Sequence, residues 1–258
     1  MNGIDIASWQ ANLNTETIAA DFIIVKATEG YTYKNPYFKT QIDGAIKAGK
    51  RIGCYHYADG LDAAKEAQHF LDVAGEYTGK AIFCLDWESN NNASYAQHSA
   101  WCEKWIDYVE QKTGITPFIY ISAGLLQQFK EIAEKYPMWI AQYPDYEKVN
   151  GYQQRPWNEG AYSCAIRQYT SMLYLDGYTG RLDGNKCYLS PAEWDAYTQP
   201  TKLTEGSTGK DESTDIISDT AKQVIAGVYG NGDERKQKIG EYFYNKVQSK
   251  VNEMLGGN

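Results

Sequence analysis

The stretch Ile82-Phe83-Cys84-Leu85-Asp86-Trp87-Glu88 consists of four apolar residues followed by two carboxylates with a tryptophan between them. A short apolar run of this kind is typical of a buried strand in a parallel sheet that helices cover. Side chains alternate along a strand, so we expect Asp86 and Glu88 on one side and Trp87 on the other. The Cβ atoms of the two acids would then lie roughly 6.5–7 Å apart.

Two carboxylates at the end of one strand suit glycoside hydrolysis. One acid protonates the leaving oxygen, and the second carboxylate supports the positive charge that develops on the sugar. An Asp-x-Glu at a strand end also occurs where the pair simply meets solvent or a helix N-terminus. The motif alone leaves both interpretations open, and the other strand ends have to decide between them.

The composition limits the class of protein. The chain has 258 residues, enough for one large domain or for one large and one small domain. With 25 Lys+Arg against 33 Asp+Glu it is acidic, which argues against nucleic acid as the main partner. The 22 tyrosines and 7 tryptophans suit carbohydrate surfaces, although packing of a core explains many of them equally well.

The cysteines and histidines favour no metal and no cofactor. The five cysteines are scattered without a Cys-x-x-Cys, so neither a zinc site nor a disulfide framework is predicted. They are typical of reduced thiols in a protein made in the cytoplasm. The histidines have no metal-ligand spacing. We see no signal peptide of the usual kind and no apolar run of the ~18–20 residues that a membrane helix needs, so we expect no membrane partner.

Short apolar runs alternate with longer amphipathic ones over residues 1–198, which predicts an α/β fold with a parallel sheet. The expected helices occupy 36–48, 63–74, 95–112 and 123–135. About eight strands in this length suggest a barrel, and the loss of helices after Tyr136 suggests an incomplete TIM-like one. The expected strands are 3–6, 22–27, 51–57, 81–87, 117–121, 138–141, 164–169 and a short one ending near Asp183.

The C-terminal ends of parallel barrel strands meet at one mouth, where the active site of such a barrel lies. Polar and aromatic residues mark most of the expected strand ends. They come from distant parts of the chain, so their convergence is stronger evidence than any single motif. The residues are Asp5, Tyr55, Tyr57, Asp86, Glu88, Tyr120, Trp139, Gln168 and Asp183.

The composition changes near residue 199. Residues 199–212 are polar and predict a flexible linker. Residues 213–258 predict a small module of three helices, because apolar residues recur there at helical spacing. One stripe is Ile217, Ala221, Val224, Ile225 and Val228, and another is Val247, Val251, Met254 and Leu255.

Several blocks in order resemble the family 25 glycoside hydrolases, the lysozymes of phages and bacteria. These blocks cover nearly all of residues 1–190. The resemblance implies a (β/α)5β3 barrel and an N-acetylmuramidase that cuts the β-1,4 bond after N-acetylmuramic acid in bacterial peptidoglycan. The blocks begin Gly3-Ile-Asp-Ile-Ala-Ser-Trp-Gln and Phe22-Ile-Ile-Val-Lys-Ala-Thr-Glu-Gly, and continue with Gly53-Cys-Tyr-His-Tyr, Leu85-Asp-Trp-Glu, Met138-Trp-Ile-Ala-Gln-Tyr, Ile166-Arg-Gln-Tyr and Leu182-Asp-Gly-Asn.

The same resemblance implies roles for the carboxylates. Glu88 matches the general acid, Asp86 its partner carboxylate, and Asp5 and Asp183 the other two acids of the mouth. We expect repulsion among four carboxylates to keep Glu88 protonated while Asp86 stays ionised. The resemblance leaves the retaining or inverting outcome open, and we favour participation of the substrate's acetamido group.

The expected substrate-binding residues come from two arguments. The resemblance places Tyr57, Trp139 and Gln168 in the sugar cleft, and the expected strand ends add Tyr120, Lys26 and Trp9. For Lys26 a structural ion pair is equally open. For Trp9 the alternative is packing in the core.

Residues 221–252 resemble the cell-wall-binding repeat of pneumococcal phage lysozymes, here in one copy. The whole therefore resembles a phage or prophage endolysin, made in the host cytoplasm and released to the wall through a holin. A single copy would bind best if the protein self-associates. Two alternatives remain, a chitinase-like hydrolase and a non-catalytic glycan-binding barrel, and the intact Glu88 argues against the second.

Overall fold

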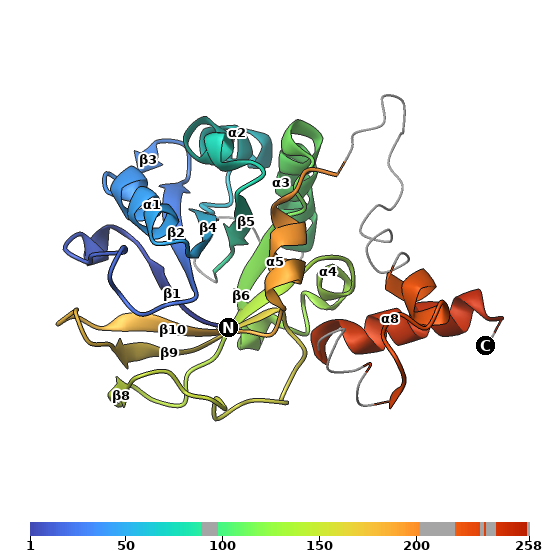
Figure 1. Cartoon of the computed structure of the whole chain (residues 1–258). Helices are drawn as coiled ribbons and strands as arrows, with labels where there is room; N and C mark the ends of the chain where they lie inside the picture. The colour runs from blue at the N-terminus through green and yellow to red at the C-terminus, as the bar shows by residue number, and fades with distance from the viewer. Residues whose placement is uncertain (89–97, 202–219, 233–234, 236–240, 257–258) are drawn as a thin grey trace.

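The computed structural model describes residues 1–88, 98–201, 220–232, 235 and 241–256 (Figure 1). Eight strands close into a barrel, since β1 pairs with β2 on one side and with β10 on the other. This confirms the predicted barrel. The strands are β1 (Asn2–Ile6), β2 (Phe22–Glu29), β4 (Arg51–Tyr57), β5 (Ala81–Asp86), β6 (Phe118–Ser122), β7 (Met138–Ala141), β9 (Ile166–Tyr174) and β10 (Leu182–Cys187), with β3 (Tyr33–Lys34) and β8 (Val149–Asn150) added outside the closed ring.

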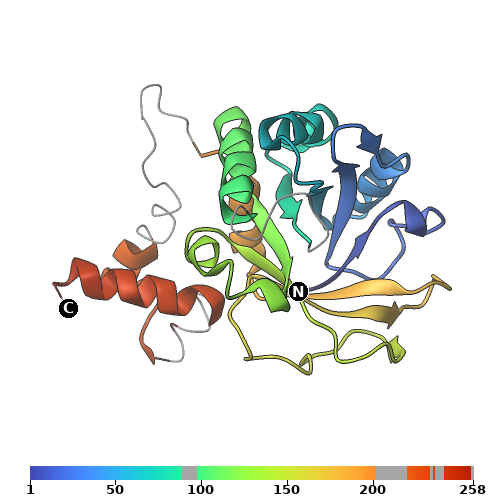
Figure 2. The ribbon, with the colours of Figure 1, turned by 180° about the vertical axis from the view of Figure 1, so that it is seen from behind.

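Helices cover the outside of only part of this barrel (Figures 1 and 2). One α-helix follows each of β2, β4, β5 and β6, and β1 is followed by the 3₁₀ turn η1 (Ser8–Gln10). The described chain from 142 to 165 holds no helix, so β7, β9 and β10 are joined by loops and a hairpin. This is the incomplete barrel that the sequence predicts. The α-helices are α1 (Phe38–Lys47), α2 (Ala63–Ala74), α3 (His98–Thr113), α4 (Lys130–Lys135) and α5 (Pro191–Thr198).

Two expected elements differ from the structure. The last strand does not end near Asp183 but begins at Leu182, because β9 and β10 form an antiparallel pair and the chain direction reverses. Asp183 therefore lies at the start of its strand and still reaches the mouth. The expected helix 123–135 is broken into a 3₁₀ turn and α4, since the backbone at the buried Phe129 is not helical. Positions 95–97 of another expected helix lie outside the described residues.

The apolar residues form one layer inside the barrel and one outside it. Strand alternation sends Phe22 and Ile24 into the inner cluster and Ile23 and Val25 into the outer one, which packs under the helices. Trp194 of α5 belongs to the inner cluster, and its ring lies 4.9 Å from that of Phe22. This packing fills one end of the barrel and leaves the opposite end for a pocket.

Residues beyond α5 begin on the barrel itself. The Gln199 amide donates to the carbonyl of Gly79 over 3.1 Å, and the Thr201 N–H donates to that of Gly114 over 2.9 Å. These bonds hold 199–201 against the barrel, so the linker predicted from 199 would begin later. Most of the predicted linker lies outside the described residues.

The described C-terminal residues include helix at 220–225 and α8 (Glu241–Met254), with a turn at 226–229 between them. Only part of each predicted stripe is buried. Ile225 and Val228 of the first stripe and Met254 and Leu255 of the second are exposed, and Ile217 lies outside the described residues. The three-helix arrangement and the domain limits stay predictions. Among the described helices, we find none whose length and hydropathy would let it span a bilayer. The buried members of the stripes are Ala221, Val224, Val247 and Val251.

Candidate active site

A pocket of about 250 Å³ opens where the parallel strands end, and it brings together every site residue that the sequence predicts. All four carboxylates line it. So do all six residues expected to bind substrate. The carboxylates are Asp5, Asp86, Glu88 and Asp183, and the other six are Trp9, Lys26, Tyr57, Tyr120, Trp139 and Gln168.

The Asp-Trp-Glu stretch follows the expected alternation. Asp86 is the last residue of β5, and both Asp86 and Glu88 face the pocket. Trp87 between them is fully buried on the other side, with its ring centroid 4.9 Å from those of His98 and Trp101. Its backbone N–H donates to the Tyr120 carbonyl over 2.9 Å. The tryptophan thus fixes the backbone from which both acids project.

Burial dominates the electrostatics of this pair. It raises the pKa of Asp86 well above its ordinary value, and the charge of Glu88 raises it further. Burial also raises the pKa of Glu88, and the ammonium of Lys26 lowers the pKa of both acids. Burial therefore raises the pKa of both acids, and the expected division, with Glu88 protonated and Asp86 ionised, stays a prediction.

Asp5 and Asp183 form a second pair on β1 and β10. Burial raises the pKa of Asp183 to about 6, with the guanidinium of Arg181 acting against it. Burial and then the charge of Asp183 raise the pKa of Asp5 well above its ordinary value. Like charges at short range titrate as a unit, so the pair loses its protons in coupled steps.

The predicted binding residues play different structural parts. Trp9 is 89% exposed at the rim, whereas Trp139 is 2% exposed and forms the floor. Of these two tryptophans only Trp9 presents an open ring face to a sugar. Lys26 makes the ion pair that the sequence left open, 2.5 Å from Glu29, and its ammonium also lies 4.5 Å from the centroid of the Tyr57 ring within the pocket.

Sequence reasoning missed some of the pocket residues, among them Tyr143 and Gln10. Tyr143 lies in the loop after β7, and its hydroxyl donates to Oε1 of Gln168. Gln10 follows Trp9 on η1. Tyr55 lines the pocket from β4, as its place at an expected strand end predicted, although the sequence assigned it no role. The feature of the sequence that could have indicated Tyr143 is the pair Gln-Tyr directly after the apolar strand 138–141. A loop residue shows no periodicity from which its direction can be inferred.

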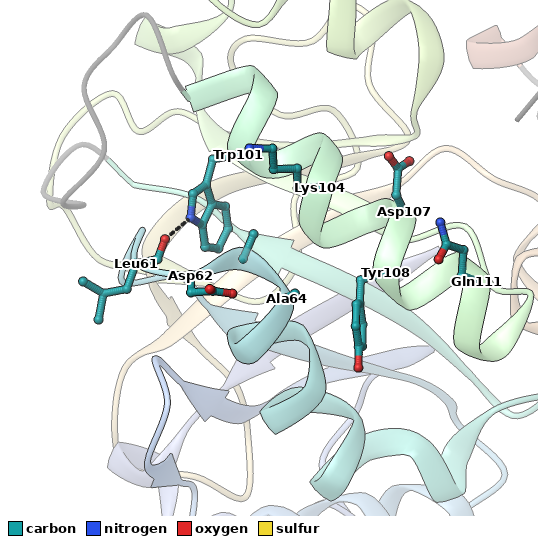
Figure 3. Close-up of a pocket in the computed structure, with 9 residues that line it drawn as sticks. Leu61, Asp62, Ala64, Trp101, Lys104, Asp107, Tyr108 and Gln111 are labelled. Atoms are coloured by element: carbon teal, nitrogen blue, oxygen red, sulfur yellow. Dashed lines mark hydrogen bonds between the residues drawn. The ribbon is translucent and has the colours of Figure 1, made fainter.

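A second hollow, of about 490 Å³, lies outside the barrel between α2 and α3 (Figure 3). Two of its polar groups serve the local structure: the Trp101 indole donates to the Leu61 carbonyl over 2.8 Å, and Asp62 accepts from the Lys65 N–H at the start of α2. The barrel mouth, where all the predicted site residues line one pocket, is the candidate active site. Among the described residues, no group of three or more acids, cysteines or histidines is arranged to hold a metal ion.

A closed barrel with four carboxylates and several aromatic side chains at the C-terminal mouth is the architecture of a glycoside hydrolase. The comparisons with known proteins agree. The family model described as glycosyl hydrolases family 25 matches residues 4–178, and the chain belongs to that family. A second model, the CW_7 repeat, matches residues 218–255.

Three relatives illustrate the similarity. An uncharacterised protein of Escherichia coli K12 is 28% identical over 79% of this chain and 75% of its own. The lysozyme of Streptococcus phage Cp-7 is 26% identical over 97% of this chain and 69% of its own. The structure of a family 25 lysozyme from Aspergillus fumigatus matches with a TM-score of 0.62 and 25% identity, over 77% of this chain and 98% of that one. These matches support the enzyme class and the barrel.

Proposed function

We propose that this enzyme is a muramidase that hydrolyses the β-1,4 bond between N-acetylmuramic acid and N-acetylglucosamine in bacterial peptidoglycan. Membership of family 25 and the lysozyme names of its relatives support this substrate. The observation that carries the proposal is the pairing of Glu88 with Asp86 at the mouth, where Oδ1 of Asp86 is buried without a hydrogen-bond partner among the described residues.

Glu88 acts as the general acid in this proposal. Its pKa is raised by burial, so the carboxyl keeps its proton to a higher pH than an exposed glutamate does. As the glycosidic bond breaks, this proton passes to the leaving oxygen. The resulting carboxylate then takes a proton from the water that completes hydrolysis.

Asp86 acts on the acetamido group of the sugar. A buried carboxylate oxygen without a partner is costly, and the N–H of an N-acetyl sugar supplies the missing donor. That bond turns the acetamido oxygen toward the anomeric carbon. The oxygen forms a bond to this carbon as the bond to the leaving group breaks, and water later opens the cyclic intermediate with overall retention. Binding the N–H also lowers the pKa of Asp86, since it favours the anion.

Asp5 and Asp183 supply further negative potential at the mouth. Both lie in the pocket with the reacting pair, and their charges reach it: Asp5 raises the pKa of Asp86. We assign them to stabilising positive charge at the sugar ring and to accepting hydrogen bonds from its hydroxyls. The exposed Trp9 ring stacks on a neighbouring sugar of the glycan chain.

The C-terminal part, in this proposal, brings the enzyme to the wall. The CW_7 repeat match at 218–255 supports a wall-binding module rather than a second catalytic unit. The exposed apolar side chains of Ile225, Val228 and Leu255 support self-association of this module, which strengthens weak single-site binding. The similarity to a phage lysozyme supports an endolysin, made in a host cytoplasm and released through a holin.

The test is digestion of purified Gram-positive walls, with mass spectrometry of the fragments after borohydride reduction. The proposal expects every new reducing end to be N-acetylmuramitol, with no fragments from the matched Glu88→Gln protein. New ends of N-acetylglucosaminitol would show a glucosaminidase instead. Release of sugars from chitin at the same rate would favour the chitinase-like alternative.

A further inference from the structure

The carboxylate of Asp5 is held from two sides by side-chain amides. Nδ2 of Asn185 donates to its Oδ1 over 2.6 Å, and Nε2 of Gln168 donates to the same oxygen over 2.7 Å. Asn185 is fully buried and Gln168 is 3% exposed. Because Oδ1 already accepts two N–H groups, any proton on Asp5 has to reside on its other oxygen.

The direction of the Asn185 amide is set by a third residue. Nε1 of Trp139 lies 2.8 Å from Oδ1 of Asn185. An indole N–H donates and never accepts, so this contact requires the oxygen end of the amide at Trp139. The nitrogen end is thereby directed at Asp5. The oxygen and nitrogen ends of an amide are alike in shape, and here the N–H of the tryptophan decides which end faces which way.

The Gln168 amide is held from the opposite side by two tyrosine hydroxyls. The hydroxyl of Tyr120 donates to its Oε1 over 2.9 Å, and the hydroxyl of Tyr143 donates to the same atom. Rings that line the pocket thus control both amides, and both amides converge on one carboxylate oxygen. A fully satisfied buried network of this kind holds its members in one arrangement.

We propose that Asn185 is a positioning residue of the reaction: oriented by Trp139, it holds the carboxylate of Asp5 in the one orientation that serves the sugar-binding mouth. Asn185 does not line the pocket, so it acts through Asp5 and not on the substrate. Its donated hydrogen bond favours the ionised form of Asp5 against the cost of burial. This inference rests on the proposed muramidase activity for its kinetic test.

The decisive variant is Asn185→Asp, which keeps the shape and replaces the donor by a carboxyl. Trp139 can still donate to one oxygen of the new side chain. The other oxygen then faces Oδ1 of Asp5, and two oxygens at this distance bond only if one carries a proton. We expect kcat at pH 7 to fall roughly 10–100-fold, as for a misplaced catalytic group. At acid pH the new carboxyl is protonated and donates, so activity returns and the alkaline limb moves down by about one pH unit or more.

Two further variants separate positioning from general damage. Asn185→Leu cannot donate at any pH, so its activity is low throughout and shows no recovery in acid. Asn150→Asp makes the same chemical change at an exposed position of β8 and leaves the wild-type pH profile unchanged. If Asn185→Asp keeps the wild-type profile, or loses activity by one factor at every pH, the positioning role is wrong.

Trp139→Phe covers the case in which Asn185→Asp does not fold at neutral pH. It keeps a six-membered aromatic ring at the floor of the pocket but removes the indole N–H that orients the amide, together with the rest of the five-membered ring, and we expect kcat to fall more than KM changes. An unchanged kcat would contradict the proposal. If the wild-type enzyme itself fails to cut peptidoglycan, titration of the Asp5 carboxyl by NMR gives a separate readout. Asn185→Leu should then raise the pKa of Asp5, and an unchanged pKa would overturn the inference.

Discussion

Asp5 and Asp183 lie directly opposite each other, as register partners on the antiparallel strands β1 and β10. Neighbouring acids on paired strands repel when both are ionised. The fold holds them together, and both pKa values are raised in the folded state. A group of this kind stabilises the fold below its unfolded pKa and loses that contribution as the pH rises through its folded pKa.

Asp183→Asn should therefore increase stability in a pH-dependent way. The folded pKa of Asp183 is about 6 against an ordinary 3.8, so the gain should be small at pH 4 and appear as the pH approaches 7. Its upper bound is on the order of 3 kcal/mol in the free energy of unfolding. Urea unfolding of both proteins at pH 4 and pH 7 measures the difference. An equal effect at the two pH values would show that ionisation of the buried Asp183 carboxyl is not its cause.

Glu88→Gln should lose nearly all wall cleavage while keeping the fold. The amide resembles the carboxyl in shape but cannot give up a proton, and general acid catalysis is typically worth ~10²–10⁴-fold. The measurement is the initial rate on a soluble glycan, together with a thermal melt. A variant that keeps more than about a tenth of the wild-type rate would remove Glu88 from the role of acid.

Asp86→Asn should lower kcat far more than it changes KM. The amide leaves the shape of the site intact but removes a charge that counts mainly in the transition state. Because burial raises the pKa of Asp86, removing the carboxyl should also stabilise the fold at neutral pH. Steady-state kinetics and urea unfolding test the two halves separately. A large rise in KM with unchanged kcat would show that Asp86 only binds substrate.

Lys26→Met should move the activity profile toward higher pH. The Lys26 ammonium lowers the pKa of both Asp86 and Glu88, so its removal raises both. The acid then stays protonated to higher pH, and the partner carboxylate ionises later, which shifts both limbs of kcat/KM upward. Lys26→Arg keeps the charge and serves as the matched control. A downward shift, or identical profiles for the two variants, would contradict this electrostatic role.

A chain ending after Thr201 should fold and cut soluble glycan strands at close to the full-length rate. The hydrogen bonds of residues 199–201 to Gly79 and Gly114 place this end on the barrel, so it is a better limit than one before them. On intact walls we expect the shortened chain to be slower, most clearly at low concentration. Equal rates on walls at every concentration would exclude a targeting role for the C-terminal part.

The barrel and its carboxylates could be predicted because they depend on local patterns. Strand alternation places Asp86 and Glu88 on the same face and Trp87 behind them, and the structure agrees. The reversal of the last strand could not be predicted, since the sequence of a strand such as β9 does not show whether a hairpin or a crossover follows it. The site was unaffected because Asp183 reaches the mouth from either direction.

The sequence alone could not tell which of the two acids, Asp86 or Glu88, has the higher pKa. Charge repulsion alone suggested that Glu88 would hold a proton and Asp86 would not. Burial also contributes and is not visible in the sequence: Asp86 is only 7% exposed, and its desolvation raises its pKa. The role of Asn185 was hidden for a similar reason. Its effect depends on Trp139 and Asp5, which lie on two other strands and far away in sequence.

The closure of the barrel through β1 and β10 has a consequence for the time at which the enzyme becomes active. Asp5 is made among the first residues, whereas Gln168, Asp183 and Asn185 belong to the last two barrel strands. A growing chain on the ribosome therefore has the Asp86 and Glu88 pair long before it has the mouth that holds a sugar. The mouth is therefore complete only after the last two strands have been made and have closed the ring.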